Sequence, residues 1–352
     1  MSQRALAPVP VPVPVPVIVI GGFLGAGKTT VLNHILSQQG DLRAAVLVND
    51  FGAINIDADL VVGVKGDVYR LSNGCVCCNI RGDLIDGCLD ILRELKRPDL
   101  LIVETSGVSD ALQVANTFLA PELQGLLSVH AILGVVDAAH FVDLEGDMAA
   151  LAQGQLAGAD IVVLNKVDLV GADALVELRT RIRRAVPGSR ILEAIHGRIA
   201  LDVILDQADR AGGRRSTLRA IGQDRHPHPS MTAWHWECAR PLSLDRLRDV
   251  FSRLPEDVYR AKGIAYLDDL PNYRVLLQMV GKRSSLAAVG IWADETPATR
   301  IVLIGTPDAF DSEEMQSEFE ACVADTDTAS SPLKTFVARV AAREPENDTQ
   351  RY

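Results

Sequence analysis

Ten residues near the start of the chain read Gly21-Gly22-Phe23-Leu24-Gly25-Ala26-Gly27-Lys28-Thr29-Thr30. From Gly22 to Thr29 they fit the P-loop pattern G-x-x-x-x-G-K-[ST], in which glycines let backbone N–H groups curl around phosphate oxygens. An apolar run at 17–20 precedes them and a helix-like run at 31–36 follows, so a helix N-terminus would face the same anion. The plainer alternative is a glycine turn between a strand and a helix. The P-loop interpretation predicts a nucleoside triphosphate site formed by Gly22, Gly25, Ala26, Gly27, Lys28, Thr29 and Thr30.

Downstream of the P-loop, short apolar runs alternate with helical patterns as far as about residue 206. Strands are expected at 17–20, 44–48, 100–103, 131–136, 161–164 and 191–192, and helices at 29–38, 83–94 and 172–185. This alternation is typical of a mostly parallel, doubly wound sheet covered on both faces. Polar motifs follow several of these strands, where open α/β sheets bind their ligands. The expected fold of residues 16–206 is therefore an α/β P-loop nucleotide-binding domain.

The composition changes between residues 207 and 231, where glycine, arginine, histidine and proline predict a linker. A smaller α+β domain is expected at 232–325. Its pattern predicts a half-buried strand around Trp234 and Trp236, a helix at 242–254 with Ser243 as its cap, a meander of strands at 262–267, 273–280, 286–292 and 300–304, and a helix at 313–323. Residues 1–15 are expected to form a disordered Pro-Val tail, and 326–352 a second tail with a helical pattern at 333–342.

Length, charge and hydropathy exclude several classes of protein. A chain of 352 residues suggests about two domains. Its formal net charge of −11 argues against a dedicated nucleic-acid binder, which usually carries a basic face. No apolar run reaches the roughly 20 residues of a membrane span, and alternating prolines interrupt the N-terminal run that a signal peptide would need. The expectation is a cytoplasmic protein that binds neither membrane nor nucleic acid.

A second motif, Asn165-Lys166-Val167-Asp168, follows the strand at 161–164 and is suited to selecting the nucleotide base. A carboxylate such as Asp168 can accept two hydrogen bonds from the N1 and amino edge of guanine, a pair that adenine cannot supply. The Asn165 amide can contact the base or brace the P-loop, and the Lys166 stem can cover the ring. The motif therefore favours GTP over ATP. The alternative is a helix cap provided by Asp168.

An acidic motif, Glu104-Thr105-Ser106-Gly107, follows the strand at 100–103. P-loop enzymes place an acid here that holds Mg²⁺ near the γ-phosphate, and Glu104 can also position the attacking water. Thr29 offers its hydroxyl to the same ion, and Gly107 offers an N–H to the phosphate. For Glu104 the alternative is a strand-end carboxylate without a catalytic role. With Asp57, a candidate switch residue in the loop after the second strand, the candidate catalytic residues are Lys28, Glu104 and Asp57.

A cluster of thiols occurs at Cys75-Val76-Cys77-Cys78. Thiolates are soft ligands suited to Zn²⁺ or Cu⁺, and three so close together cannot form the usual structural site built from two separate C-x-x-C pairs. The cluster predicts two or three sulfur ligands completed by a residue from elsewhere, with Asp50 as a candidate, or by water. A site that is incompletely enclosed suits metal transfer better than storage. The alternative is a set of buried or redox-active cysteines.

The remaining thiols, histidines and tryptophans are interpreted as structural. His34 on the first helix is assigned no ligand role. His226 and His228 in the linker can bind a transition metal weakly, although a solvated pair is the favoured interpretation. The residues expected in the two cores are Cys88, Cys238, Cys322, Trp234 and Trp236.

Together these motifs resemble the CobW-type P-loop GTPases, metallochaperones that include cobalamin-biosynthesis proteins, zinc-transfer GTPases and nitrile hydratase activators. The resemblance spans roughly residues 16–325 and runs through segments 21–30, 49–52 with Asp57, 71–78, 104–107, 165–168, 262–263 and 302–305. It implies GTP hydrolysis coupled to delivery of a metal, with Cys75, Cys77 and Cys78 as ligands between the switch regions. Asp50 stands where the family usually has a glutamate, so its carboxylate is shorter by one methylene.

The resulting hypothesis is a two-domain GTPase that uses GTP, GDP and Mg²⁺ to control a thiolate metal site. No catalytic Gln or Arg finger is visible, so unassisted turnover of roughly 10⁻⁴ to 10⁻² s⁻¹ is expected. The metal is expected to be Zn²⁺, with Co²⁺ and Fe²⁺ as alternatives, and the partner is a client metalloprotein; homo-oligomerisation is left open. Two other interpretations remain: a metal-responsive regulatory module in which GTP is mainly a structural ligand, and a small-molecule kinase, against which Asp168 argues.

Overall fold

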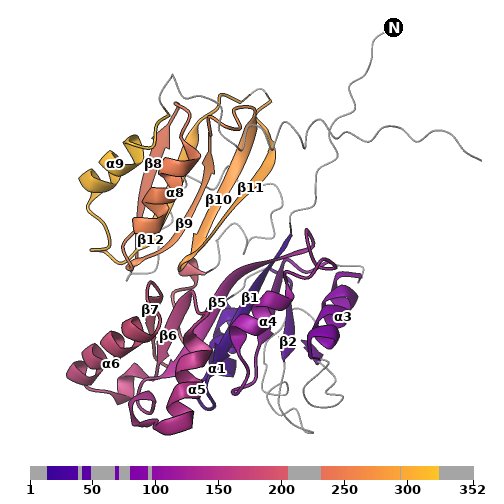
Figure 1. Cartoon of the computed structure of the whole chain (residues 1–352), viewed down its shortest axis with the longest axis vertical. Coiled ribbons are helices and arrows are strands. Elements are labelled where there is room, and N and C mark those ends of the chain that lie inside the picture. The colour runs from indigo at the N-terminus through magenta and orange to yellow at the C-terminus, as the bar shows by residue number, and fades with distance from the viewer. Residues whose placement is uncertain are drawn as a thin grey trace, which may run out of the picture.

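A computed structural model describes residues 14–38, 42–48, 68–70, 80–93, 97–204, 231–293 and 295–324. Two β-sheets organise these residues (Figure 1). The strands of the first sheet are β1 (Val15–Gly22), β2 (Ala44–Val48), β3 (Val68–Arg70), β4 (Leu100–Glu104), β5 (Leu127–Asp137), β6 (Ile161–Asn165) and β7 (Arg190–Ala194). The described helices around it are α1 (Lys28–Ser37), α3 (Ile80–Arg93), α4 (Ala111–Thr117), α5 (Gly146–Leu156) and α6 (Ala172–Ala185), with the 3₁₀ turns η1 (Phe141–Asp143), η2 (Val167–Leu169) and η3 (Leu201–Val203).

The first sheet has the strand order β3-β2-β4-β1-β5-β6-β7, and every described pair of strands in it is parallel. The strand that enters the P-loop, β1, therefore lies in the middle, between β4 and β5. Because the carboxyl ends of parallel strands meet at one edge, the motifs that follow β1, β4 and β6 are brought to the same place. The expected α/β class and parallel sheet are confirmed.

Helices cover both faces of this sheet. On one face, Ile18 and Ile20 of β1 pack with Val31 and Leu32 of α1. On the other face, alternate strand residues pack against α3 and α4, and further along the sheet against α5 and α6. Figure 1 shows α3, α4, α5 and α6 on the side nearer the viewer, with α1 behind. A strand buried on both faces needs apolar residues at every position, which explains the continuous apolar runs in the sequence.

The second sheet is antiparallel and follows in the chain. Its strands are β8 (Thr232–Cys238), β9 (Val258–Ala265), β10 (Tyr273–Val280), β11 (Arg283–Ile291) and β12 (Thr299–Gly305), and its helices are α8 (Leu244–Arg253) and α9 (Ser312–Glu320). The strand order is β11-β10-β9-β12-β8. The expected meander is wrong for its last strand, because β12 pairs with β9 and β8 instead of β11. The alternating residues Ile301 and Leu303 of β12 are buried against the helices, whereas β11 stays exposed at the edge.

The core of the second sheet forms around Phe319 of α9, which is fully buried. Its ring lies 5.4 Å from that of Trp234, 5.3 Å from that of Trp236 and 6.1 Å from that of Phe251 of α8, measured between centroids. Figure 1 shows α8 and α9 on the same face of this sheet. The placement of both tryptophans in the core is confirmed, and tilted or edge-to-face ring pairs of this kind add to the stability from area burial. Ser243 precedes α8 but makes no capping hydrogen bond through its side chain.

The two sheets meet beside the start of β6. The Asp160 carboxylate, 1% exposed as a residue, accepts hydrogen bonds from Arg283 Nε at 2.8 Å and from the Ile132 amide at 2.9 Å. Tyr259 of β9 donates its hydroxyl to the Ile191 carbonyl at 2.8 Å and belongs to the buried cluster that also contains α1. A buried carboxylate from the first sheet's region thus meets a partly exposed arginine from the second sheet.

Residues 1–13 of the predicted Pro-Val tail, residues 207–230 of the predicted linker and the helical pattern at 333–342 fall outside the described residues. The expected end of the tail at residue 15 is wrong, because Val15 already pairs with Leu127 as the first residue of β1. The domain boundaries at 16–206 and 232–325 stay predictions. No helix in the described part of the chain is long and apolar enough to cross a membrane.

Candidate functional site

The P-loop connects β1 to α1 at the centre of the first sheet. Gly27 occupies the position just before the helix with φ 96°, a left-handed conformation that a side chain disfavours. A Cβ atom on Gly27 would lie 2.4 Å from Asn165 Nδ2, so the loop and the Asn-Lys-x-Asp motif are in direct contact here. The first amides of α1 have no partner within the helix and carry its positive end. This segment has the geometry of an anion-binding loop.

The hydroxyl of Thr29 and the carboxylate of Glu104 are in contact where the P-loop enters α1. Thr29 Oγ1 donates to Glu104 Oε1 at 2.7 Å, and Glu104, the last residue of β4, is only 2% exposed. Lys28 is buried, and its Nζ donates to the Phe23 carbonyl at 3.3 Å. Hydroxyl and carboxylate oxygens are the ligands that Mg²⁺ prefers, and here the two lie side by side. Lys28 is placed next to the backbone of the loop. The first residues of α1 and the last residue of β4, which are far apart in sequence, are thus brought together.

Gly107 lies against the same loop. A Cβ atom at Gly107 would be 2.4 Å from Leu24 Cδ2, so only a glycine allows this approach. The Gly107 carbonyl accepts a hydrogen bond from the buried side chain of Gln155 at 2.8 Å, which fixes the segment after β4 to α5. The predicted contact between Gly107 and a phosphate stays a prediction, but its position beside the P-loop agrees with it.

Asn165 joins three segments. It is the last residue of β6, and only 2% of it is exposed. Its Nδ2 donates to the Ala26 carbonyl at 3.0 Å, and its Oδ1 accepts from the Gly197 amide at 2.9 Å. Of the two roles that the sequence left open for this amide, the structure shows the bracing of the P-loop. The loop after β7 is held against the phosphate loop by the same side chain.

Lys166 and Asp168 follow directly. Lys166 has φ 63°, uncommon for a residue with a side chain, and its Nζ donates to the Gly25 carbonyl at 2.9 Å and to Asp137 Oδ2 at 2.6 Å. Asp168 lies in η2 with its carboxylate exposed to solvent. An exposed carboxylate next to a lysine that lies along the P-loop is the arrangement a guanine edge would need.

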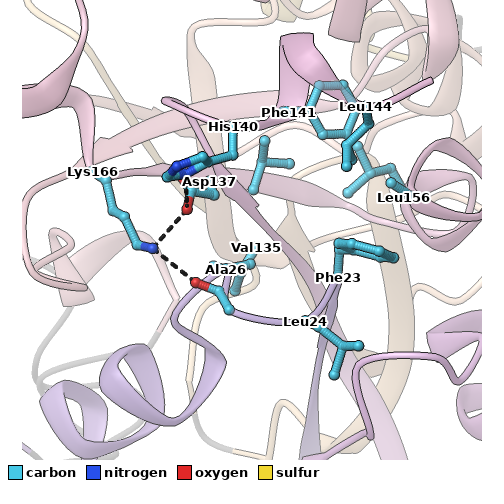
Figure 2. Close-up of a pocket in the computed structure, with 13 residues that line it drawn as sticks. Phe23, Leu24, Ala26, Val135, Asp137, His140, Phe141, Leu144, Leu156 and Lys166 are labelled. Atoms are coloured by element: carbon cyan, nitrogen blue, oxygen red, sulfur yellow. Dashed lines mark hydrogen bonds and ion pairs between the residues drawn. The ribbon is translucent and has the colours of Figure 1, made fainter. Parts of the chain in front are cut away.

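A cavity of about 310 Å³ opens between the P-loop and the segment after β5 (Figure 2). Apolar side chains such as Phe23, Phe141 and Leu156 line one part of it, while Asp137, His140 and Lys166 lie together at another. Partial burial alone would raise the pKa of Asp137, but hydrogen bonds from Lys166, His140 and the Ala139 amide outweigh it and leave the pKa below its usual range. Asp137 is therefore an anion at neutral pH.

The predicted transition-metal site lies outside the described residues, as do its candidate ligands Cys75, Cys77, Cys78 and Asp50 and the switch residue Asp57. The linker histidines His226 and His228 lie outside them as well. Within the described ranges no group of three or more His, Cys, Asp or Glu side chains is arranged to hold a metal ion.

The cysteines expected in the cores are found there. Cys88 and Cys322 are fully buried, and burial raises the pKa of the Cys88 thiol to about 12 and that of Cys322 to about 11. Neither forms the thiolate that binds metals at neutral pH. Cys238 is partly buried against the same core as Cys322. His34 has the structural role expected of it, a 3.1 Å contact between its Nε2 and the Ile199 carbonyl.

Sequence reasoning missed three residues of the site. Asp137 ends β5 as Glu104 ends β4 and Asn165 ends β6, and this shared strand-end position was a usable signal. Gly197 follows the short apolar run of β7, where a glycine marks a tight turn. Gln155 carries no local signal, because its role depends on how α5 packs against the segment after β4.

Two family models match the chain. The nucleotide-binding domain described as CobW/HypB/UreG matches residues 16–193, and the C-terminal domain of the cobalamin synthesis protein cobW matches residues 231–323. The first covers the P-loop, the Glu104 segment and the Asn165 motif, and the second covers the antiparallel sheet.

Characterised relatives are similar over most of the chain. A zinc chaperone CobW from Pseudomonas aeruginosa is 33% identical over 333 residues, which cover 82% of this chain and 86% of the relative. A zinc chaperone CobW from a Sinorhizobium species is 30% identical over 82% of this chain and 92% of the relative. A zinc-regulated GTPase metalloprotein activator from Dictyostelium discoideum is 28% identical over 79% of this chain and 69% of the relative.

Proposed function

Because this chain belongs to the CobW family, we propose that it is a GTP-hydrolysing metallochaperone that couples its nucleotide state to the binding and delivery of a transition metal. The chain is a P-loop GTPase of this family. The proposal adds that the metal is zinc, with cobalt or iron as alternatives, and that a client protein receives it. The names of the relatives support the choice of zinc.

One observation carries the nucleotide half of the proposal: Asn165 and Lys166 of the guanine-type motif donate hydrogen bonds to the carbonyls of Ala26 and Gly25 in the P-loop. In this proposal, the segment that recognises the base is connected to the phosphate-binding loop through these two hydrogen bonds. An enzyme that used the P-loop alone would not need this connection.

In the proposed reaction, water attacks the γ-phosphate of GTP and the products are GDP and inorganic phosphate. The P-loop amides and Lys28 hold the phosphates, and Asp168 selects guanine. Thr29 and Glu104 are the residues that would hold Mg²⁺, which neutralises charge on the phosphates when bound. Glu104 also fits the role of positioning the attacking water, because its carboxylate lies beside the loop.

The metal half of the proposal rests on Cys75, Cys77 and Cys78 with Asp50. Their segments lie in sequence between the P-loop and Glu104, around the Asp57 loop, so loss of the γ-phosphate can alter the ligand set. Changes in the order of such loops are a known switching mode of nucleotide-binding proteins. Zinc, cobalt and iron all accept thiolate ligands, and availability often decides among them.

The decisive test compares Zn²⁺ affinity in the presence of a non-hydrolysable GTP analogue and of GDP, by competition with a chromophoric chelator. A metallochaperone should show a difference of about tenfold or more between the two states, since one state must load the metal and the other release it. Cys77→Ser should weaken Zn²⁺ binding and leave nucleotide binding intact. Equal metal affinity in both nucleotide states would reject delivery and favour a regulatory module.

Base recognition is tested with Asp168→Asn. The amide can no longer accept both guanine hydrogen bonds but can pair with xanthine, so preference should move from GTP toward xanthosine triphosphate. Asp173→Asn, an equivalent change at an exposed position early in α6, is the matched control and should keep the GTP preference. Retention of the GTP preference by Asp168→Asn would refute the assignment of this residue.

A further inference from the structure

Asp137 ends β5 in register with Asn165 at the end of β6. Its side chain is 14% exposed and accepts three hydrogen bonds: from Lys166 Nζ at 2.6 Å, from His140 Nδ1 at 2.9 Å and from the Ala139 amide at 3.0 Å. Figure 2 shows the Lys166 ammonium between this carboxylate and a carbonyl of the P-loop, with a dashed line to each. No motif recognised in the sequence includes Asp137.

The lysine needs an anchor for a physical reason. A lysine side chain has four rotatable bonds and loses much conformational freedom when it is fixed over a ligand. The backbone of Lys166 also has φ 63°, a conformation that is uncommon for a residue with a side chain and that costs free energy unless surrounding contacts hold it. The Gly25 carbonyl is a neutral acceptor, whereas Asp137 provides the stronger, charge-assisted hydrogen bond.

An ordinary surface ion pair would not carry this role, because such pairs contribute little. This pair differs in two respects. The Lys166 ammonium bridges two separate elements, the P-loop and the end of β5, and the acceptor carboxylate lies mostly buried in the wall of the cavity. Fixing a ligand-binding group before the ligand arrives lowers the entropy lost on binding and so raises affinity.

We propose that Asp137 is a positioning residue for guanine-nucleotide binding: its carboxylate holds Lys166 against the P-loop, so that the lysine stem is already in place to cover the purine ring. The inference rests on the proposed guanine specificity. Asp137 itself touches neither base nor phosphate in this role, and its effect acts through Lys166.

The test is a double-mutant cycle on the full chain, with GDP and GTP-analogue affinities measured by fluorescence of labelled nucleotides. Asp137→Asn removes the charge but keeps the size of the side chain, and it should lower the affinity for both nucleotides about tenfold. Lys166→Met keeps an unbranched stem and removes the ammonium. In the Lys166→Met background, the further effect of Asp137→Asn should fall to less than about twofold, because the group that Asp137 positions is gone.

Two controls test whether Asp137 acts through Lys166 and not on the fold as a whole. Asp143→Asn changes an exposed aspartate in η1 on the same segment and should leave affinity unchanged. The preference of Asp137→Asn for GTP over xanthosine triphosphate should stay that of the unmodified protein, since Asp168 sets it.

If Asp137 had a merely structural role, Asp137→Asn would lower nucleotide affinity as much in the Lys166→Met background as in the unmodified protein. That result, or unchanged affinity in Asp137→Asn, would overturn the inference. Failure of the unmodified protein to prefer guanine over adenine nucleotides would instead refute the proposed function.

Discussion

The two β-sheets of this protein keep their polar side chains in different places. In the first sheet β4, β5 and β6 end in Glu104, Asp137 and Asn165, and these side chains converge on the P-loop at one edge. In the second sheet the residues facing the helices are apolar and pack around Phe319. Parallel strands bring all their carboxyl ends to one edge, whereas antiparallel strands divide them between two edges. Strand direction thus explains why one sheet assembles a site and the other mainly packs a core.

The comparison predicts that the largest loss of stability and the loss of function come from different regions. Phe319→Ala should lower the free energy of unfolding by about 3–5 kcal/mol, because it removes a fully buried ring that contacts three others. Under native conditions its affinity for GDP should be unchanged. Urea unfolding and nucleotide titration measure the two quantities.

Leu286→Ala on the exposed strand β11 is the matched control, since its side chain is 38% exposed and its loss should change the stability by less than about 1 kcal/mol. Should Phe319→Ala weaken GDP binding as strongly as a P-loop substitution does, the two sheets would have to be treated as one energetic unit and the contrast between them abandoned.

The converse variant is Lys28→Ala. Loss of this ammonium should lower kcat/KM for GTP by about 10²–10³-fold, because it removes a fixed positive charge from the developing charge on the phosphates. The midpoint of thermal unfolding without nucleotide should change little by comparison with Phe319→Ala. A phosphate-release assay and calorimetry test the pair of expectations; near-normal turnover would exclude Lys28 from the reaction.

A smaller effect is expected for Gly27→Ala, which probes the contact between the P-loop and Asn165. The backbone of the new alanine would have to stay in a left-handed conformation, which costs about 1–2 kcal/mol. In addition, its Cβ atom would lie 2.4 Å from Asn165 Nδ2. Displacement of Asn165 should lower the affinity for GDP about tenfold.

Gly188→Ala separates the two effects of that substitution. Gly188 has φ 74°, and a Cβ there would meet no atom within 4 Å. This variant should lose similar stability and keep its nucleotide affinity. Equal affinities in the two variants would show that the contact with Asn165 does not matter for binding.

Much of this arrangement could be predicted from sequence because it is encoded locally. Continuous apolar runs predict the buried parallel strands, and the P-loop and Asn-Lys-x-Asp motifs carry their spacing within a few residues. The strand-end position of Asp137 is a local signal, but its contact with Lys166 could not be predicted, because that contact requires β5 to lie beside β6, which periodicity does not report. The pairing of β12 with β9 was missed for the same reason: alternation predicts a strand but not its neighbour.

The smallest expected effect is a pH dependence where the two sheets meet. Burial raises the pKa of Asp160, and the Arg283 guanidinium, the Ile132 amide and Lys282 lower it by less. Because the folded pKa lies above the unfolded value of about 3.9, Asp160 contributes stability that is fully present below the unfolded pKa and lost as the pH rises through the folded pKa. The side chain of the Asp160→Asn variant cannot titrate. The thermal unfolding midpoint of this variant should therefore increase relative to that of the unmodified protein as the pH rises from about 4. Glu237→Gln in the exposed pair with Arg300 controls for loss of a carboxylate. An opposite slope would mean that the ion pair with Arg283 outweighs burial, and a difference that is constant with pH would mean that the two effects cancel; either result would refute the expected pH dependence.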